Sequence, residues 1–262
     1  MSKIEQKFND TRKSKKIACM PFLVGGDPDY KTSLNRFRHL AYESDLLEIG
    51  VPFSDPIADG ITIQEADQRA LKNGATPDTI LSLISELRKF TNIPITLLIY
   101  ANLIQQKGID VFYRLAHLSG VDGVLIPDVP FEESEPYIKA ARKHKIDHIA
   151  LIAPTTDENR IKRIVPQATG FIYLVSTLGV TGIRKKLPSS LNSQIAKIKK
   201  YTHLPIAVGF GISIPKHVIE LEKMKTDGFI VGSALIKLME TGNTETIKLK
   251  IMKEYVRKMN GL

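Results

Sequence analysis

The sequence predicts an α/β fold, a closed (β/α)8 TIM barrel, and three observations carry this prediction. Eight short runs rich in Val, Ile and Leu alternate with longer segments whose apolar residues recur every three or four positions. The short runs are apolar throughout, which is typical of parallel strands covered on both faces. No Pro/Ser-rich linker or break in composition interrupts the alternation, so we expect residues 1–262 to form a single domain with extra helices in its βα loops. An open, doubly wound parallel sheet is the alternative.

The predicted elements follow one another along the whole chain. The strands are expected at residues 17–24, 46–51, 94–100, 123–128, 148–154, 170–176, 205–211 and 227–233. Amphipathic helices are expected at residues 32–43, 76–90, 108–119, 133–144 and 189–201. An additional helix is expected at 61–74, after the second strand, because its apolar and small residues keep helical spacing and Gly74 is a natural C-terminal cap. Active sites of this fold form at the carboxyl ends of the strands, so we expect the functional residues at those positions.

Composition and charge narrow the class of protein. The chain is 43% apolar and 25% charged, as ordinary globular proteins are, and has no apolar run near the roughly 18 residues that a membrane span needs. Its N-terminus is charged and lacks the apolar core of a secretory signal, so we expect a cytoplasmic protein. The net charge of +9 comes from scattered lysines without a nucleic-acid-binding motif, so we expect an anionic substrate or an acidic partner and no nucleic acid.

Cysteine and histidine usage argues against a metal site. Cys19 is the only cysteine, which excludes an intrachain disulfide and a zinc site built from several thiolates, and its apolar neighbours predict a buried residue of the first strand. The six histidines form no close pair with ligand spacing, and the motifs HExxH, GxSxG and GxxxxGK[ST] are missing from the sequence. We therefore expect neither a metal nor nucleoside-triphosphate chemistry.

The stretch LEIGVPFSDPIADG, residues 47–60, places carboxylates at and after the end of the second strand. Glu48 has apolar neighbours, so it is either a structural residue paired with a hydroxyl or lysine, or a pocket acid whose pKa burial raises toward the range useful for proton transfer. Asp59 lies in a loop stiffened by Pro52 and Pro56, which favours a carboxylate held in place over a simple Asp-Gly turn. Asp55 is better placed to hold the loop or to touch another subunit.

Three glycine-rich segments at adjacent strand ends predict a phosphate site. VGFGIS, residues 208–213, closes the seventh strand, and VGSAL, residues 231–235, ends the eighth strand and opens a helix. GVTG, residues 179–182, follows the sixth strand, and its glycines around Thr181 suit a lid. Each segment alone is also compatible with a plain turn, but phosphate sites after strands seven and eight recur in this fold.

Eight stretches in order over nearly the whole chain closely resemble the tryptophan synthase α-subunit family: PFLVGGDPD, LEIGVPFSDPIADGITIQ, LLIYANL, GVLIPDVPFEE, LIAPTT, YLVSTLGVTG, VGFGIS and VGSALIK. The resemblance implies a lyase of tryptophan biosynthesis that cleaves indole-3-glycerol phosphate to indole and glyceraldehyde 3-phosphate by retro-aldol chemistry. It implies no cofactor in this chain and an α2β2 complex with a pyridoxal-phosphate-dependent β subunit, while the chain alone is expected to be monomeric. The lid stretch STLGVTG differs from the SRAGVTG-like or SVTGVTG-like stretch more usual in the family, a difference that bears on loop dynamics and on coupling to the β subunit.

The resemblance also implies roles for individual residues. Glu48 and Asp59 are the implied catalytic pair, with Glu48 protonating indole C3 and moving the hydroxyl proton, and Asp59 binding the indole N–H. The implied indole pocket comprises Phe22, Leu98, Leu125, Leu151 and Tyr173. The implied phosphate site comprises Gly182, Phe210, Gly211, Gly232 and Ser233, with Ile212 and Ile61 nearby and Thr181 as the lid residue. The implied partner-facing positions are Pro52, Asp55, Asn102 and Pro130.

Two competing interpretations of the sequence stay open. Another phosphate-binding barrel, such as a sugar-phosphate isomerase or indole-3-glycerol-phosphate synthase, has the same glycine-rich strand ends, but the synthase is expected to place a lysine in the pocket and the strand ends offer none. A barrel without turnover that only activates its β subunit is the alternative from a different functional class. The presence of both Glu48 and Asp59 favours the lyase.

Overall fold

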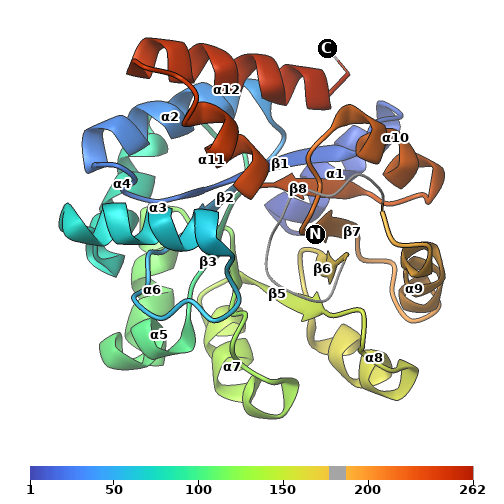
Figure 1. Cartoon of the computed structure of the whole chain (residues 1–262). Helices are drawn as coiled ribbons and strands as arrows, with labels where there is room; N and C mark the ends of the chain where they lie inside the picture. The colour runs from blue at the N-terminus through green and yellow to red at the C-terminus, as the bar shows by residue number, and fades with distance from the viewer. Residues whose placement is uncertain (177–186, 262) are drawn as a thin grey trace.

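Eight parallel strands close into a barrel in which each strand pairs with its neighbour in sequence and β8 returns to β1 (Figure 1). The computed structural model describes residues 1–176 and 187–261. The strands are β1 (Ala18–Val24), β2 (Leu47–Gly50), β3 (Ile95–Leu98), β4 (Gly123–Leu125), β5 (Asp147–Ile152), β6 (Ile172–Val175), β7 (Ile206–Gly209) and β8 (Gly228–Val231). The closed order confirms the predicted (β/α)8 barrel and excludes the open sheet.

Most strands are shorter at their carboxyl ends than the apolar runs predicted. The run at 94–100, for example, contributes only Ile95–Leu98 to the sheet, and Tyr100 already caps the following helix. The remaining apolar residues of such a run belong to the βα loop and still count as buried, as Ile99 and Tyr100 are. Buried loop residues have the same apolar character as strand residues. For this reason the predicted strands reach into the loops that build the mouth of the barrel.

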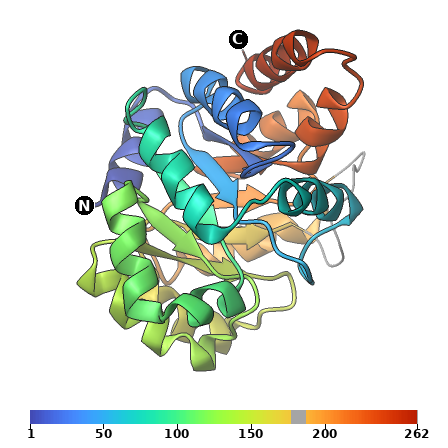
Figure 2. The same ribbon diagram turned by 90° about the vertical axis from the view of Figure 1, so that its left-hand side faces the viewer.

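Helices surround the barrel on all sides (Figure 2). They are α1 (Lys3–Lys13), α2 (Tyr30–Glu43), α3 (Ile61–Lys72), α4 (Pro77–Leu87), α5 (Ala101–Lys107), α6 (Ile109–Ser119), α7 (Glu135–Lys143), α8 (Glu158–Ile164), α9 (Ser190–Lys199), α10 (Pro215–Lys223), α11 (Ser233–Met239) and α12 (Glu245–Met259), with 3-10 turns at Phe131–Glu133 and Val165–Gln167. The extra helix predicted after the second strand is α3, and Gly74 has a φ of 81°, as a C-terminal glycine cap requires.

The N-terminal helix α1 was not predicted, because its sequence is mostly charged. Its Ile4 and Phe8 are fully buried, and the Phe8 ring lies 5.5 Å from that of Phe171, at the start of β6. Gly228 leaves the space that Phe8 occupies, since an added Cβ there would lie 2.8 Å from the Phe8 ring. These two apolar residues, four positions apart, pack α1 against the amino ends of the strands, opposite the mouth.

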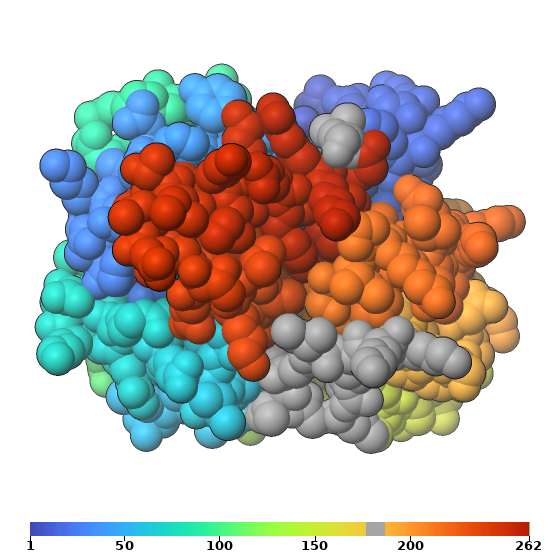
Figure 3. Space-filling model, turned by 45° about the horizontal axis from the view of Figure 1, so that its top comes forward, coloured from blue at the N-terminus to red at the C-terminus, as the bar shows by residue number. Residues whose placement is uncertain are grey.

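The C-terminal helices cover one side of the barrel. In Figure 3 the red C-terminal segment lies between the blue and cyan N-terminal half of the chain and the orange segment around α10. α12 contacts α2, and the buried guanidinium of Arg36 on α2 binds Glu245 on α12 through two hydrogen bonds of 2.8 Å. No helix among residues 1–176 and 187–261 has the length and apolar character needed to cross a membrane. Cys19 is buried in β1, as its apolar neighbours predicted.

Candidate active site

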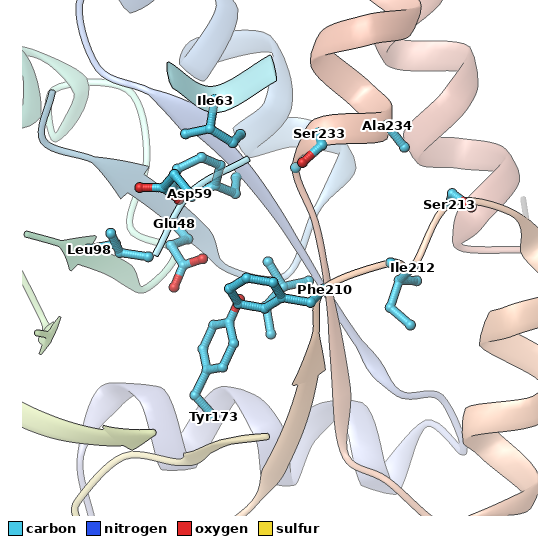
Figure 4. Close-up of a pocket in the computed structure, with 14 residues that line it drawn as sticks. Glu48, Asp59, Ile63, Leu98, Tyr173, Phe210, Ile212, Ser213, Ser233 and Ala234 are labelled. Carbon is cyan, nitrogen blue, oxygen red and sulfur yellow. The ribbon is translucent and has the colours of Figure 1, made fainter. Parts of the chain in front are cut away.

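A pocket lies at the carboxyl ends of the strands, where active sites of barrels form (Figure 4). Strand ends and βα loops on both sides of the barrel contribute to its wall. Its lining residues are Phe22, Glu48, Asp59, Ile63, Leu98, Tyr173, Phe210, Gly211, Ile212, Ser213, Ile230, Gly232, Ser233 and Ala234. The structure therefore brings together both predicted carboxylates, three of the five predicted indole-pocket residues and all the predicted phosphate-site residues except Gly182, which lies outside the described residues.

Glu48 points into the barrel from β2. It pairs with Phe22 on β1 and Thr96 on β3, and paired residues of parallel strands share one face of the sheet. Its side chain is 1% exposed, and Oε1 has no hydrogen-bond partner among the described residues. Burial, and secondly the charge of Asp59, raise the pKa of Glu48 to about 8. A carboxyl group of this kind is protonated at neutral pH and is suited to donate a proton.

Asp59 faces the same pocket from the loop after β2, and its environment differs from that of Glu48. Burial raises the pKa of Asp59 to about 6, while the hydroxyl of Tyr100, which donates a 2.6 Å hydrogen bond to Oδ2, opposes this rise. The group is therefore mainly ionised at neutral pH. Two carboxyl groups in one pocket with separated pKa values are the arrangement expected of an acid and an electrostatic partner.

Tyr100 holds the loop that carries Asp59, and this residue was not predicted from the sequence. Its ring stacks on Phe53 with 5.0 Å between centroids, and its hydroxyl oxygen accepts a 3.1 Å hydrogen bond from the amide of Ala58. The side-chain amide of Gln64 donates a 2.8 Å bond to the carbonyl of Asp59. Tyr100 thus fixes both the loop and the carboxylate. The signal available in the sequence was a polar-tipped aromatic directly after a buried strand.

Glycines make room for the aromatic walls of the pocket. Phe22 lies between Gly50 and Gly232, where an added Cβ would come within 2.7 Å and 2.9 Å of its ring. A Cβ on Gly209 would overlap the hydroxyl of Tyr173. Tyr173 itself meets Phe210 edge to face, with 6.2 Å between centroids. The flat apolar walls formed in this way suit a planar aromatic ligand.

The side of the pocket away from the carboxylates is rich in backbone amides. Figure 4 shows Glu48 and Asp59 on one side, Ile212 and Ser233 on the other, and Phe210 between them. In α11, the amide of Ile236 is the first to bond within the helix, to the carbonyl of Gly232, so the helix does not use the amides of Ser233 and Ala234. This wall offers N–H donors to an anion.

Some predicted pocket residues lie elsewhere in the structure. Leu125 pairs with Leu98, and Leu151 pairs with Tyr173, so both share the inner face of the sheet, yet neither lines the pocket. Ile61 differs from the expectation more clearly, because its side chain is 70% exposed. The helical repeat of α3 turns Ile63 into the pocket in its place. Thr181 and Gly182 lie outside the described residues.

The four predicted partner-facing residues lie at the same end of the barrel, on the segments that follow β2, β3 and β4. Asp55, Asn102 and Pro130 are exposed, whereas Pro52 is buried, contrary to the expectation of a surface position. Pro52 directly follows Val51, whose amide is bonded to the carbonyl of Leu98, so this part of the loop is still held against the sheet.

Within residues 1–176 and 187–261, no group of three or more His, Cys, Asp or Glu side chains is arranged to hold a metal ion. The arrangement instead supports acid–base chemistry on a ligand with an aromatic ring at one end and an anion at the other.

Comparison with known proteins gives matches over nearly the full length. A family model described as tryptophan synthase alpha chain matches residues 8–261. The tryptophan synthase alpha chain of Methanoregula boonei is 44% identical over 262 residues, covering 99% of this chain and 97% of that protein. The corresponding chain of Methanothermobacter thermautotrophicus is 48% identical over 233 residues, covering 88% of this chain and 86% of that protein.

Solved structures agree with these sequence matches. The tryptophan synthase α-subunit of Pyrococcus furiosus superposes with a TM-score of 0.87 at 37% identity and covers 94% of this chain and 99% of that one. An α2β2 tryptophan synthase complex of the same organism gives a TM-score of 0.88 at 38% identity, with the same coverage. Tryptophan synthase of Mycobacterium tuberculosis gives a TM-score of 0.91 at 28% identity, covering 99% of this chain and 97% of that one.

Proposed function

Because this chain belongs to the tryptophan synthase alpha chain family, we propose that Glu48 and Asp59 perform the chemistry of that family. The chain is a carbon–carbon lyase of tryptophan biosynthesis that cleaves indole-3-glycerol phosphate to indole and glyceraldehyde 3-phosphate. The observation that carries the assignment of roles is the pair of buried carboxyl groups in one pocket, with pKa values of about 8 and about 6.

Cleavage begins at C3 of the indole ring. Protonated Glu48 donates its proton to C3, which converts the ring to an indolenine cation and leaves Glu48 ionised. Glu48 then removes the proton of the adjacent glycerol hydroxyl, the carbonyl of the aldehyde forms, and the bond between C3 and the glycerol chain breaks. The bonding electron pair returns to the ring, and neutral indole results. Glu48 ends the cycle protonated, so the step balances without a further reactant.

Asp59 stabilises the positive charge that the indole ring gains when C3 is protonated. In the proposed complex its carboxylate accepts a hydrogen bond from the indole N–H, which becomes stronger when the indolenine carries positive charge. A preorganised charge in a pocket closed to water stabilises such a transition state far more than the same charge in water. Tyr100 supports this role, since its hydroxyl bond favours the ionised form of Asp59.

The two ends of the substrate match the two walls of the pocket. The indole ring is proposed to lie against Phe22, Leu98 and Tyr173, beside the carboxylates. The phosphate is proposed to bind the amides and the hydroxyl of the opposite wall, at Gly211, Ile212, Gly232 and Ser233 with Phe210, together with Gly182. Leu125 and Leu151, on the inner face of the sheet, remain proposed residues of the indole site, and Thr181 remains the proposed lid residue.

A β subunit is the proposed partner of this chain. The α2β2 complex of Pyrococcus furiosus supports an equivalent assembly, with Asp55, Asn102 and Pro130 on the surface that meets the partner. The cleavage uses no cofactor in this chain, and pyridoxal phosphate belongs to the β subunit. We also infer that residues 1–262 form one domain, because α1 docks on the barrel and α12 packs on α2. A cytoplasmic location is proposed from the family.

The pH dependence of kcat/KM follows from the two pKa values. Glu48 must be protonated, so activity is expected to fall as the pH rises through about 8, and Asp59 must be ionised, so activity is expected to fall as the pH drops through about 6. The measurement is the rate of indole release between pH 5 and pH 10. The result expected is a bell-shaped profile with its maximum between the two values.

Asp67 provides a matched control for the basic limb of this profile. It is buried on α3, and burial with the charges of Asp59 and Asp27 raises its pKa to about 8 as well, but it does not line the pocket. Asp67→Asn is expected to leave the basic limb in place. Loss of that limb in Asp67→Asn would assign it to Asp67 and remove Glu48 from the role of acid.

Turnover tests the proposed function directly. The purified chain is mixed with indole-3-glycerol phosphate, with and without a tryptophan synthase β subunit, and indole and glyceraldehyde 3-phosphate are measured. Release of both products without the β subunit supports the lyase, and release that rises with the β subunit supports the partnership as well. If neither product appeared, either with or without the β subunit, the result would support the alternative of a barrel that only activates its partner.

A further inference from the structure

The loop between β7 and α10, residues 210–213, is held by side chains at both of its ends. Phe210 and Gly211 have φ angles of 68° and 77°, so the chain leaves the sheet in a left-handed turn after Gly209. The hydroxyl of Ser176, at the end of β6, donates a hydrogen bond to the carbonyl of Phe210. At the other end, the backbone amide and the backbone carbonyl of Ser213 each form a hydrogen bond with a side chain. This 210–213 loop runs from Phe210, in the middle of the pocket wall, to Ile212 and Ser213 on the side away from Glu48 (Figure 4).

His217 and Tyr255 provide the bonds at Ser213. The amide of Ser213 donates a 3.3 Å hydrogen bond to Nδ1 of His217, and the hydroxyl of Tyr255 on α12 donates a 3.0 Å bond to the carbonyl of Ser213. Because Nδ1 accepts, it carries no hydrogen and the imidazole is neutral. The bond to His217 engages the Ser213 amide and so fixes the end of the loop in which Gly211 and Ile212 line the pocket.

The position of His217 explains the bond. Ile214 is the N-cap of α10 and Pro215 its first residue, so His217 is the third residue of the helix. A Glu or Gln at that position usually bonds back to the amide of the N-cap residue in a capping box. His217 does the same one residue further back. A glutamate would bring a negative charge beneath an anion-binding wall, whereas a neutral imidazole supplies the acceptor without the charge.

His217 and Ser213 form a buried polar pair that is only partly hydrogen-bonded. The side chain of His217 is fully buried, and Nε2 of His217 and Oγ of Ser213 have no hydrogen-bond partner among the described residues. A buried polar atom without a hydrogen-bond partner destabilises the folded chain, because it has lost its bonds to water. Such costs concentrate at functional sites, where the geometry matters more than stability.

We propose that His217 is a positioning residue that fixes the 210–213 loop against the substrate phosphate and thereby sets the affinity of the pocket for phosphate esters. The inference rests on the proposed phosphate site and adds two residues to its support, His217 directly and Tyr255 as the second anchor. His217 does not touch the reacting atoms. Its effect is therefore on binding, and the chemical step at Glu48 is unaffected.

Two substitutions at His217 separate the hydrogen bond from the bulk of the ring. His217→Gln keeps an uncharged acceptor, and His217→Leu removes it. Binding of inorganic phosphate and of glycerol 3-phosphate to the full chain is measured by titration calorimetry, and KM and kcat are measured for indole-3-glycerol phosphate. His217→Leu is expected to raise both dissociation constants and KM about tenfold with kcat within about twofold, the loss of one buried hydrogen bond. His217→Gln is expected to stay within about threefold of the natural chain.

Tyr255→Phe and His148→Gln complete the experiment. Tyr255→Phe removes the second anchor and is expected to raise the dissociation constant for phosphate about threefold, a readout that remains if His217→Leu does not fold. His148 on β5 also has a buried Nδ1 without a partner in the described chain but lies outside the pocket, so His148→Gln is expected to bind phosphate normally.

Three results would overturn the proposal: unchanged phosphate binding in folded His217→Leu, binding by His217→Gln no better than by His217→Leu, or unchanged binding in Tyr255→Phe. These results concern phosphate binding alone. A failure of the proposed function would instead appear in the natural chain, as absence of indole release.

Discussion

Replacing Glu48 by Gln is expected to lower kcat for indole-3-glycerol phosphate by between about a hundredfold and ten-thousandfold, the range that a positioned general acid contributes. Glutamine keeps the shape of the side chain but can neither donate the proton to C3 nor accept the hydroxyl proton. KM is expected to change little, because the pocket walls and the phosphate end are unaltered. Steady-state kinetics of indole release measures both constants. A kcat near that of the natural chain would remove Glu48 from the mechanism.

The same substitution is expected to stabilise the folded chain at alkaline pH. The pKa of Glu48 is about 8 in the folded chain and has an ordinary value near 4.5 in the unfolded chain, so between these values the folded state binds a proton that the unfolded state does not. The stability that this group contributes is present below about pH 4.5 and is lost as the pH rises through 8. Glutamine removes this loss, so the melting temperature at pH 8.5 should exceed that of the natural chain.

Glu133→Gln provides the control for both effects. Glu133 is exposed on the 3-10 turn after β4 and lies outside the pocket. Its substitution is expected to leave kcat and the pH dependence of the melting temperature unchanged. If Glu48→Gln and Glu133→Gln gave the same melting temperatures from pH 4.5 to 8.5, the burial of an acid at position 48 would not be the cause of the stability lost at alkaline pH.

The architecture and the position of Glu48 in the pocket were predictable from the sequence because each depends on local pattern. Alternating apolar runs and helical segments determine the barrel, and a glutamate among apolar strand residues indicates a buried carboxyl group at the end of the strand. Glycine-rich strand ends similarly predicted the wall that Gly211 and Gly232 form. In each case the residue type and its place in the repeat were sufficient.

The features that were missed depend on contacts between distant segments. The bond from Tyr100 to Asp59 joins residues 41 positions apart, and no spacing in the sequence signals it. The bond from His217 to Ser213 is local, but its importance depends on the pocket wall that the loop forms. Ile61 and Ile63 are the same residue type two positions apart in the sequence. Which of them lines the pocket depends on how α3 is oriented about its axis, and in the structure it is Ile63. The separation of the two carboxyl pKa values likewise required burial and partners to be known.

Replacing Asp59 by Asn is expected to lower kcat by about a hundredfold to a thousandfold, the loss typical for one preorganised electrostatic contact. Asparagine has the same size and still presents an oxygen to the hydroxyl of Tyr100, so the loop is expected to keep its place. The bound substrate has a neutral indole, so it loses little binding energy when the carboxylate is replaced. The indolenine cation loses its interaction with the full negative charge of Asp59. The expected signature is therefore a fall in kcat with a small change in KM, measured at pH 7.5.

Tyr100→Phe separates the charge of Asp59 from its placement. It keeps the ring that stacks on Phe53 but removes the hydroxyl that favours ionised Asp59, so the pKa of Asp59 is expected to rise. The acid limb of the kcat profile should move to higher pH, and activity should recover toward that of the natural chain as the pH approaches 8. Asp59→Asn should show no such recovery at any pH. If the loss in Tyr100→Phe were independent of pH, Tyr100 would act by holding the amide of Ala58 and the loop in place, and not by keeping Asp59 charged.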